Sequence, residues 1–306
     1  MTSALQLYAM PGNEARADAL AARLGDAAAR AALELHRFPD GESLVRVQPP
    51  AGPAALVCTL RDPDRLSVPL LMAAATLREL GAGSVGLVAP YLAYMRQDRA
   101  FEPGQAVSAR IYARWLSAHF DWLLTVDPHL HRIASLEQVY TLRARVVHAA
   151  PAVARWIAAQ IRRPLLIGPD AESRQWVADV AARIGAPMLV LDKQRRGDLD
   201  VSSSLPELAQ WRQRTPVLLD DIASSGRTLA VVLQQLRAQG LADAVCVVTH
   251  GLFARDALPV LRAAGAARLA CTDSVDPPPG VERIELDGEL AEALRDIAAP
   301  QPGATS

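Results

Sequence analysis

The sequence predicts an α/β protein of two domains, each a mainly parallel sheet flanked by helices. Short apolar runs alternate with amphipathic segments along most of the chain, which is typical of successive β–α–β units. The 306 residues, 51% of them hydrophobic, are enough for two domains of ordinary size. Polar clusters directly follow several of the apolar runs. In α/β proteins, functional groups lie at the ends of strands.

The elements follow from the spacing of apolar residues, which repeats along a helix and runs continuously through a buried strand. In the first half we expect strands at 5–9, 33–38, 44–47, 56–60, 85–90 and 122–126, and helices at 14–24, 68–80 and 107–120. In the second half we expect strands at 165–167, 188–191, 217–219, 245–249 and 268–272, and helices at 153–161, 176–184 and 229–239.

The clearest break between the halves lies near residues 148–151, where a strand-like stretch gives way to a helix that begins at Pro151. We therefore expect an N-terminal domain at 1–148 and a C-terminal domain at 149–300. The short polar segment at 301–306 is expected to be a flexible tail. Both halves show the same alternation of strands and helices, which is compatible with a duplication of one domain. No strong residue-level repeat is visible.

Composition excludes several function classes. The chain has 32 basic and 33 acidic residues, and this balance argues against a nucleic-acid partner. The three cysteines, Cys58, Cys246 and Cys271, lie in or beside apolar runs without metal-ligand spacing, as expected of buried thiols in a reducing compartment. No signal peptide or membrane-spanning run is apparent. We expect a cytoplasmic protein without a membrane partner.

One familiar motif is misleading here. Residues 81–86 match the G-x-G-x-x-G pattern of dinucleotide-binding folds. The match follows a predicted helix and precedes a predicted strand, which is the reverse of the order that this function requires. Gly81 is better interpreted as the end of the helix at 68–80.

The most informative stretch is 215–229. An apolar strand ends in Asp220 and Asp221, and a small polar loop at 224–228 leads into a helix. Free backbone N–H groups and the dipole at a helix N-terminus favour a phosphate, and Gly226 lets an anion approach closely. The two acids suit sugar hydroxyls or a Mg²⁺–water shell. A surface turn with an N-cap is the simpler alternative.

Two clusters in the first half add polar groups. Residues 38–42, Phe-Pro-Asp-Gly-Glu, form either a tight turn or acceptors for an adenine amine. Residues 91–99 end in Arg96, Gln97, Asp98 and Arg99. Two arginines near an amide suit a polyphosphate, although a solvated charged loop is the alternative.

Three further clusters follow predicted strands. Asp127 and His129 follow the strand at 122–126, and Asp170 follows that at 165–167. These groups are candidates for Mg²⁺ or phosphate contact, although histidine is an uncommon magnesium ligand. Lys193 and Arg195 lie two residues apart, which places both on one face of an extended segment. They suit a lid over a transferring phosphoryl group, or alternatively a basic hairpin tip.

Together these clusters resemble the ribose-phosphate diphosphokinase (phosphoribosyl pyrophosphate synthetase) family. The family motifs occur here in family order between residues 38 and 228, and the segment 249–253 is also similar. The motifs are Phe-x-Asp-Gly-Glu at 38–42, Tyr-x-Arg-Gln-Asp-Arg at 94–99, Thr-Val-Asp-x-His at 125–129, Pro-Asp at 169–170, Lys-x-Arg at 193–195, and a phosphoribosyl loop opened by Asp-Asp at 220–228.

The resemblance implies two domains of the type I phosphoribosyltransferase fold and a homo-oligomer. It implies Mg²⁺-dependent transfer of the diphosphoryl group of ATP to the 1-hydroxyl of ribose 5-phosphate, leaving AMP. The implied ATP-binding residues are Phe38, Asp40, Glu42, Arg96, Gln97, Asp98 and Arg99. The implied metal ligands are His129, Asp170 and Asp127, and the implied catalytic residues are Lys193 and Arg195. The implied ribose 5-phosphate-binding residues are Asp220, Asp221, Ser224, Ser225, Gly226, Arg227 and Thr228.

This chain departs from the family pattern in the loop. Ser224 and Arg227 stand where many bacterial members have Asp-Thr-Gly-Gly-Thr, and the segment after Lys193 is closer to archaeal-type members. Two other functions stay open. One is a phosphoribosyltransferase that consumes phosphoribosyl pyrophosphate, and the other is a non-catalytic homologue that binds nucleotide and regulates a partner.

Overall fold

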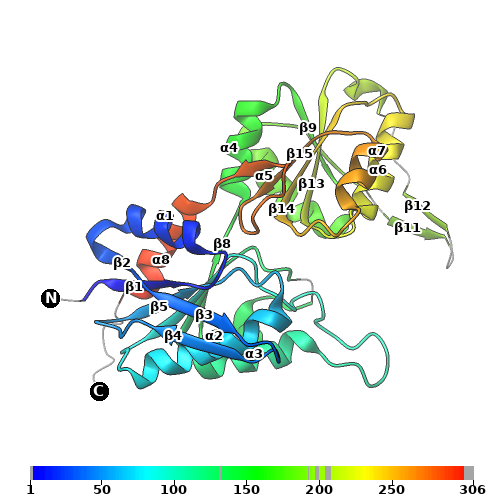
Figure 1. Ribbon diagram of the computed structural model, residues 1–306. Helices are drawn as coiled ribbons and strands as arrows, with labels where there is room; N and C mark the ends of the chain where they lie inside the picture. The colour runs from blue at the N-terminus through cyan, green and yellow to red at the C-terminus, as the bar shows by residue number, and fades with distance from the viewer. Residues whose placement is uncertain (1–2, 131, 192, 197–199, 204–207, 300–306) are drawn as a thin grey trace. The chain divides into compact units, whose positions relative to one another are not determined.

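The computed structural model describes residues 3–130, 132–191, 193–196, 200–203 and 208–299, with backbone alone for 193–196 and 200–203. The chain forms two compact units (Figure 1). The first contains residues 1–147 together with 287–306, and the second contains 148–286. The predicted tail at 301–306 lies outside the described residues.

The first unit is organised around a six-stranded sheet in the order β2-β1-β5-β6-β7-β8. All of its neighbouring strands pair in parallel. This confirms the parallel α/β class for the first half. The strands are β1 (Leu5–Ala9), β2 (Ala28–Ala31), β5 (Ala54–Val57), β6 (Val85–Ala89), β7 (Trp122–Val126) and β8 (Arg143–Val147).

The second unit repeats this topology. Its sheet has the order β10-β9-β13-β14-β15-β16, and again every neighbouring pair is parallel. The two sheets therefore agree strand for strand, so the duplication that the sequence left open is present in the topology. The strands are β9 (Pro164–Gly168), β10 (Met188–Val190), β13 (Thr215–Ala223), β14 (Ala244–Gly251), β15 (Ala266–Thr272) and β16 (Glu282–Ile284).

Helices cover both faces of each sheet (Figure 1). Right-handed crossovers that run in opposite directions along a sheet place their helices on opposite faces. In the first unit α1 packs with α8, and α2 packs with α3; in the second, α4 packs with α5, and α6 with α7. Their bounds are α1 (Glu14–Leu24), α2 (Pro63–Glu79), α3 (Ser108–His119), α4 (Ala150–Gln160), α5 (Arg174–Ile184), α6 (Arg227–Ala238), α7 (Ala257–Ala264) and α8 (Asp287–Ala298).

The last helix of each repeat belongs to the other unit. Helix α4 follows β8 but packs on α5 and β16, whereas α8 follows β16 but packs on α1, β7 and β8. An ion pair between Arg16 and Asp287 joins α1 to α8, and Arg143 donates to the carbonyl of Ile297 at 2.9 Å. The sequence division at 148 assigned α8 to the second domain, and the structure differs at this point.

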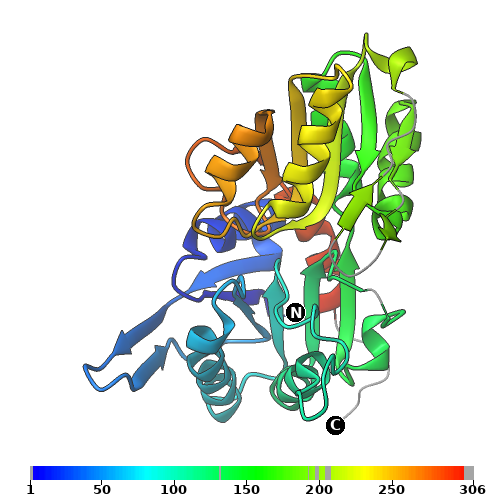
Figure 2. The ribbon, with the colours of Figure 1, turned by 90° about the vertical axis from the view of Figure 1, so that its right-hand side faces the viewer.

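Each unit also carries an antiparallel hairpin outside its main sheet. The hairpin of β3 (Leu33–Arg37) and β4 (Ser43–Val47) follows β2 and extends away from the six-stranded sheet of its unit (Figure 2). The hairpin of β11 (Lys193–Arg196) and β12 (Asp200–Ser203) follows β10 at the matching place in the second repeat.

Most of the core consists of apolar side chains from the strands and the inner helix faces. Cys58, Cys246 and Cys271 are buried free thiols, as predicted. Burial raises the pKa of each to about 12. Within the described residues, no helix is both long and apolar enough to cross a membrane.

The glycines of the misleading motif have structural roles. Gly81 has a left-handed φ of +95°, and its N–H bonds to the carbonyl of Arg78 at 3.0 Å just beyond α2, which confirms the helix-end interpretation. Gly86 lies on β6 against Trp122 of β7. A Cβ at Gly86 would approach the indole ring of Trp122 to 2.0 Å.

We predict that Gly86→Ala destabilises the protein because the methyl group would displace a fully buried tryptophan. Overpacking of this kind costs about 1–3 kcal/mol. The matched control is Gly83→Ala three residues earlier, where a Cβ meets no atom within 4 Å. Thermal unfolding of the two variants would measure the difference. Equal melting temperatures would contradict the tight packing of Gly86 on Trp122.

Candidate active site

Three carboxylates lie close together at one end of the second sheet. Strands β9 and β13 pair in parallel with Leu218 opposite Ile167, so Asp170 and Asp220 both follow the pairing toward the carboxyl edge. The backbone N–H of Asp221 donates to Oδ1 of Asp220 at 3.0 Å. Burial raises the pKa of Asp220 well above its usual range, and the charges of Asp221 and Asp170 raise this pKa further. Negative charge is therefore concentrated here.

The turn after these acids has the geometry expected of a phosphate loop. Gly226 is the N-cap of α6 with a left-handed φ of +69°, and its carbonyl accepts from the N–H of Ala230 at 2.9 Å. Ser225, Arg227 and Thr228 are exposed around the start of the helix. The free N–H groups of the first turn and the helix dipole favour an anion at this place.

The segment that follows β14 fixes the backbone of the loop through hydrogen bonds. The N–H of Phe253 donates to the carbonyl of Ala223 at 2.9 Å, and that of Ala254 donates to the carbonyl of Ser224 at 2.8 Å. A Cβ at Gly226 would lie 3.0 Å from Cγ of Leu261 in α7. Two neighbouring elements thus determine the path of the loop.

The Asp170 turn is equally constrained. Its carboxylate accepts from the N–H of Ser173 at 3.2 Å, and its carbonyl accepts from the Ser173 hydroxyl at 2.6 Å. Gly168 allows this close return because a Cβ there would approach Oγ of Ser173 to 2.3 Å. Glycine is required at this position by packing.

Lys193 and Arg195 lie on β11, where their backbones pair with Ser203 and Val201 of β12. The backbone forms a hairpin here, the arrangement named as the alternative to a lid, with both residues on its first strand. The side chains of these residues lie outside the described part of the structure, and their catalytic role stays a prediction.

In the first unit, the segment 38–42 forms the tip of the β3–β4 hairpin. Glu42 donates its N–H to Oδ1 of Asp40 at 3.1 Å, and Gly41 has a φ of +95°. The Phe38 ring packs edge-on against His36. The turn expected from Pro-Asp-Gly is present, and Asp40 and Glu42 are exposed there.

The ends of β6 and β7 bring two other predicted clusters together, because the N–H of Val126 donates to the carbonyl of Pro90 at 3.2 Å. The loop after β6 contains Arg96, Gln97, Asp98 and Arg99. Arg96 and Arg99 are exposed. Gln97 accepts from the hydroxyl of Ser108 at 2.5 Å.

Asp98 has a partner that sequence reasoning missed. Its side chain is 4% exposed and pairs with Arg132 at 3.1 Å. This ion pair joins the loop after β6 to the segment after β7. Nearby, the guanidinium of Arg99 lies 5.0 Å from the ring centroid of Phe101. The pairing indicates that Asp98 stabilises the loop, and its role toward a nucleotide stays a prediction.

The predicted metal ligands divide between the units: Asp127 and His129 follow β7 in the first, whereas Asp170 follows β9 in the second. Among the described residues, no group of three or more His, Cys, Asp or Glu is arranged to hold a metal. The carboxylates near Asp220 nevertheless suit Mg²⁺, which takes one or two carboxylates and completes its shell with water and phosphate oxygens.

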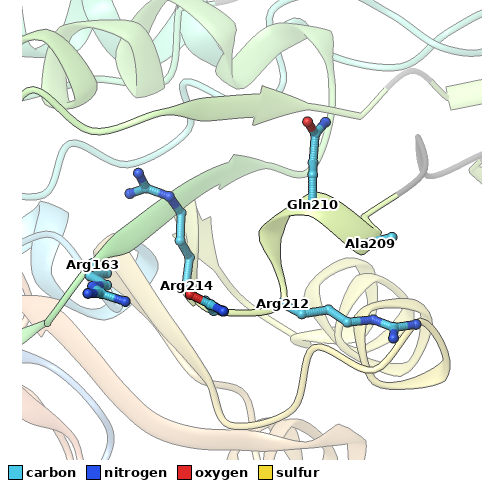
Figure 3. Close-up of a pocket in the computed structure, with 6 residues that line it drawn as sticks. Arg163, Ala209, Gln210, Arg212 and Arg214 are labelled. Atoms are coloured by element: carbon cyan, nitrogen blue, oxygen red, sulfur yellow. The ribbon is translucent and has the colours of Figure 1, made fainter.

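A hollow of about 370 Å³ lies in the second unit away from these clusters and is lined by Arg163, Ala209, Gln210, Arg212, Gln213 and Arg214. It adjoins the start of β9 and β13, the opposite end of the sheet from the acids. Figure 3 shows Arg212 pointing away from Arg163 and Arg214. Arg214 donates to the carbonyl of Pro164 at 3.2 Å and lies over Trp211. These two contacts account for the position of the Arg214 side chain, and no bound ligand is needed to explain it.

We predict that Gly226→Ala is more destabilising than Gly240→Ala at the other end of α6. Both glycines have a left-handed φ, +69° and +83°, which costs another residue about 1–2 kcal/mol. Only Gly226 is also crowded, by Leu261 at 3.0 Å, whereas the nearest atom to a Cβ at Gly240 is 3.7 Å away. Urea unfolding of both variants would compare the losses. Equal losses would contradict the crowding.

Comparison with known proteins identifies both halves. Residues 5–119 match the N-terminal domain of ribose phosphate pyrophosphokinase, and residues 135–274 match the phosphoribosyl transferase domain. The ribose-phosphate pyrophosphokinase of Methanopyrus kandleri is 35% identical over 272 residues, 88% of this chain and 91% of the relative. That of Halobacterium salinarum is 31% identical over 282 residues, 92% of this chain and 95% of the relative.

The fold agrees with a solved structure. The crystal structure of phosphoribosylpyrophosphate synthetase from Mycobacterium smegmatis superposes with a TM-score of 0.83 at 22% identity, covering 96% of this chain and 98% of that one. This confirms the predicted fold class. The Methanopyrus and Halobacterium relatives are both archaeal, in agreement with the resemblance in the segment after Lys193. The chain belongs to the ribose-phosphate pyrophosphokinase family.

Proposed function

We propose that the protein transfers the diphosphoryl group of ATP to the 1-hydroxyl of ribose 5-phosphate, giving phosphoribosyl pyrophosphate and AMP. The O1 atom of the sugar forms a bond to the β-phosphorus and loses its proton, while the bond from that phosphorus to the AMP oxygen breaks. The observation that carries the proposal is the turn between β13 and α6, where Asp220 and Asp221 precede a phosphate-type loop.

In this proposal the loop holds the sugar phosphate. The backbone N–H groups and hydroxyls at 224–228 bind the 5-phosphate, with Arg227 adding a positive charge. Asp220 and Asp221 accept hydrogen bonds from the ribose hydroxyls. Ser224 stands where many bacterial loops have an acid, so one negative charge is missing beside the phosphate, and Arg227 adds a positive charge that attracts the anion. The two acids thus suit the sugar and the loop suits the phosphate, so a sugar phosphate matches the whole turn.

In this proposal residues of the first unit bind ATP: Phe38, Asp40, Glu42, Arg96, Gln97, Asp98 and Arg99. The exposed guanidinium groups of Arg96 and Arg99 are available to phosphate oxygens. The proposed Mg²⁺ ligands are Asp127 and His129 in the first unit and Asp170 in the second, and Mg²⁺ would neutralise charge on the diphosphoryl group. Lys193 and Arg195 would stabilise the same charge as it develops.

We also propose a cytoplasmic homo-oligomer. Among the described residues, all but one of the large apolar side chains that are exposed belong to the first unit: Phe38, Leu44, Val68, Met72, Leu80, Phe101 and Trp115, against Val231 in the second. Apolar surface of this kind favours contact with another chain. Three unpaired buried thiols suit a reducing compartment.

We predict that the purified protein produces AMP from ATP only when ribose 5-phosphate and Mg²⁺ are both present. A coupled assay for AMP would measure this, with EDTA and omission of the sugar phosphate as controls. Absence of Mg²⁺-dependent AMP would exclude the synthetase function. Pyrophosphate release from phosphoribosyl pyrophosphate in the presence of a nucleobase would instead support the phosphoribosyltransferase alternative.

We predict that Lys193→Ala lowers kcat far more than it raises the KM for ribose 5-phosphate, because its charge acts in the transition state. Loss of one well-placed group of this type costs about 3–4 kcal/mol. Gln194→Ala is the matched control, since neighbouring residues of a strand face opposite sides. Unchanged turnover in Lys193→Ala would remove Lys193 from the mechanism.

A further inference from the structure

Four groups from β14, the end of β15 and the segment after it form a buried hydrogen-bond network. The hydroxyls of Thr272 and Ser274 lie 2.6 and 3.0 Å from the carbonyl oxygen of Thr249, and Nδ1 of His250 lies 2.8 Å from Oγ of Ser274. His250 is 1% exposed, and Thr249, Thr272 and Ser274 are fully buried. The network thus fixes the imidazole ring of His250 at the carboxyl edge of the sheet.

The network contains few hydroxyl hydrogens for its acceptors. The Thr272 hydroxyl lies within hydrogen-bond distance of both the Thr249 carbonyl and Oγ of Ser274, and the Ser274 hydroxyl lies within that distance of the Thr249 carbonyl and Nδ1 of His250. The tautomer of the imidazole decides whether His250 or Ser274 donates in the bond between them. With either tautomer Ser274 has a polar partner at position 250, and loss of that partner is costly because the group is buried.

The same stretch of chain supports the phosphate loop. His250 lies opposite Ile222 in the pairing of β14 with β13, and the chain then passes along the phosphate loop. There the N–H groups of Phe253 and Ala254 bond to the carbonyls of Ala223 and Ser224.

Close packing leaves little freedom between His250 and these two residues. A Cβ at Gly251 would approach Sγ of Cys271 and the Phe253 ring to 2.6 Å. Phe253 itself has a φ of +35°, a backbone conformation that non-glycine residues rarely adopt. A tightly packed stretch of chain therefore connects His250 to residues 253 and 254, which hydrogen-bond to the loop backbone.

We propose that His250 is a positioning residue for the ribose 5-phosphate loop, holding the segment 251–254 so that the N–H groups at 224–228 converge on the 5-phosphate. The inference rests on the proposed sugar-phosphate site. It assigns a role to the segment 249–253, which resembles the family in sequence but has no part in the chemistry proposed above. His250 acts through the backbone and contacts no reacting atom.

The test is the dissociation constant of ribose 5-phosphate, measured by titration calorimetry with the full chain. His250→Leu removes the hydrogen-bonding partner of Ser274, and we expect the dissociation constant to rise about tenfold, the equivalent of one hydrogen bond. His250→Asn restores a polar group near Nδ1 that can donate or accept, and binding is expected to stay within about threefold of wild type. Ser274→Ala, which removes the partner of His250, should resemble His250→Leu, and the double variant should add little to either.

Val245→Ala is the matched control for general loss of stability, since Val245 is buried at the opposite end of β14 and should leave binding unchanged. ATP affinity should be unchanged in all variants, and in the AMP assay KM for ribose 5-phosphate should rise more than kcat falls. The inference is overturned if His250→Leu binds as wild type does, if His250→Asn weakens binding equally, or if wild type binds no ribose 5-phosphate. Wild-type protein that binds the sugar phosphate but makes no AMP would reject the synthetase function alone.

Discussion

The close approach of three carboxylates at the ends of β9 and β13 is the constraint on which the candidate site depends. The parallel pairing of these strands places Asp170 beside Asp220, and the Asp221 N–H holds the Asp220 carboxylate. Burial and like charge oppose ionisation, so the pKa of Asp220 is raised. A divalent cation or sugar hydroxyls would relieve this charge, whereas the helix N-terminus beyond Gly226 attracts an anion. One turn therefore offers adjacent places for a metal or sugar and for a phosphate.

The two units share one topology, but only one of the two equivalent turns has this character, because the residues at the turns differ. In the first unit, β5 and α2 take the places of β13 and α6, but α2 begins at Pro63 after Asp62, and no glycine-containing hydroxyl loop precedes it. There the side chain of Asn13 accepts from the N–H of Thr59 at 2.8 Å, joining the ends of β1 and β5 directly. The first unit has instead developed polar loops after β6 and β7. The two halves share an architecture and differ in the chemistry of their strand ends.

Strands buried on both faces were predictable from sequence because their apolar runs are continuous, as in β6 and β9. The edge strand β2 was missed because Ala-Ala-Arg-Ala has a helical composition, and only its pairing with β1 makes it extended. The exchange of α4 and α8 could not be predicted, since an amphipathic helix does not specify which sheet it covers. The acids and the phosphate loop were visible as polar groups after apolar runs. The network around His250 was not, because its members come from separate strand ends and are recognisable only through their hydrogen bonds.

Binding of ribose 5-phosphate to the backbone at the start of α6 is the step on which the proposed chemistry depends. Hydrogen–deuterium exchange of the full chain, with and without ribose 5-phosphate, reports on these amides directly. We expect slower exchange at the amides of residues 224–228, with inorganic phosphate giving weaker protection at the same amides. Unchanged exchange in this loop, with protection confined to the first unit, would contradict the proposed sugar-phosphate site.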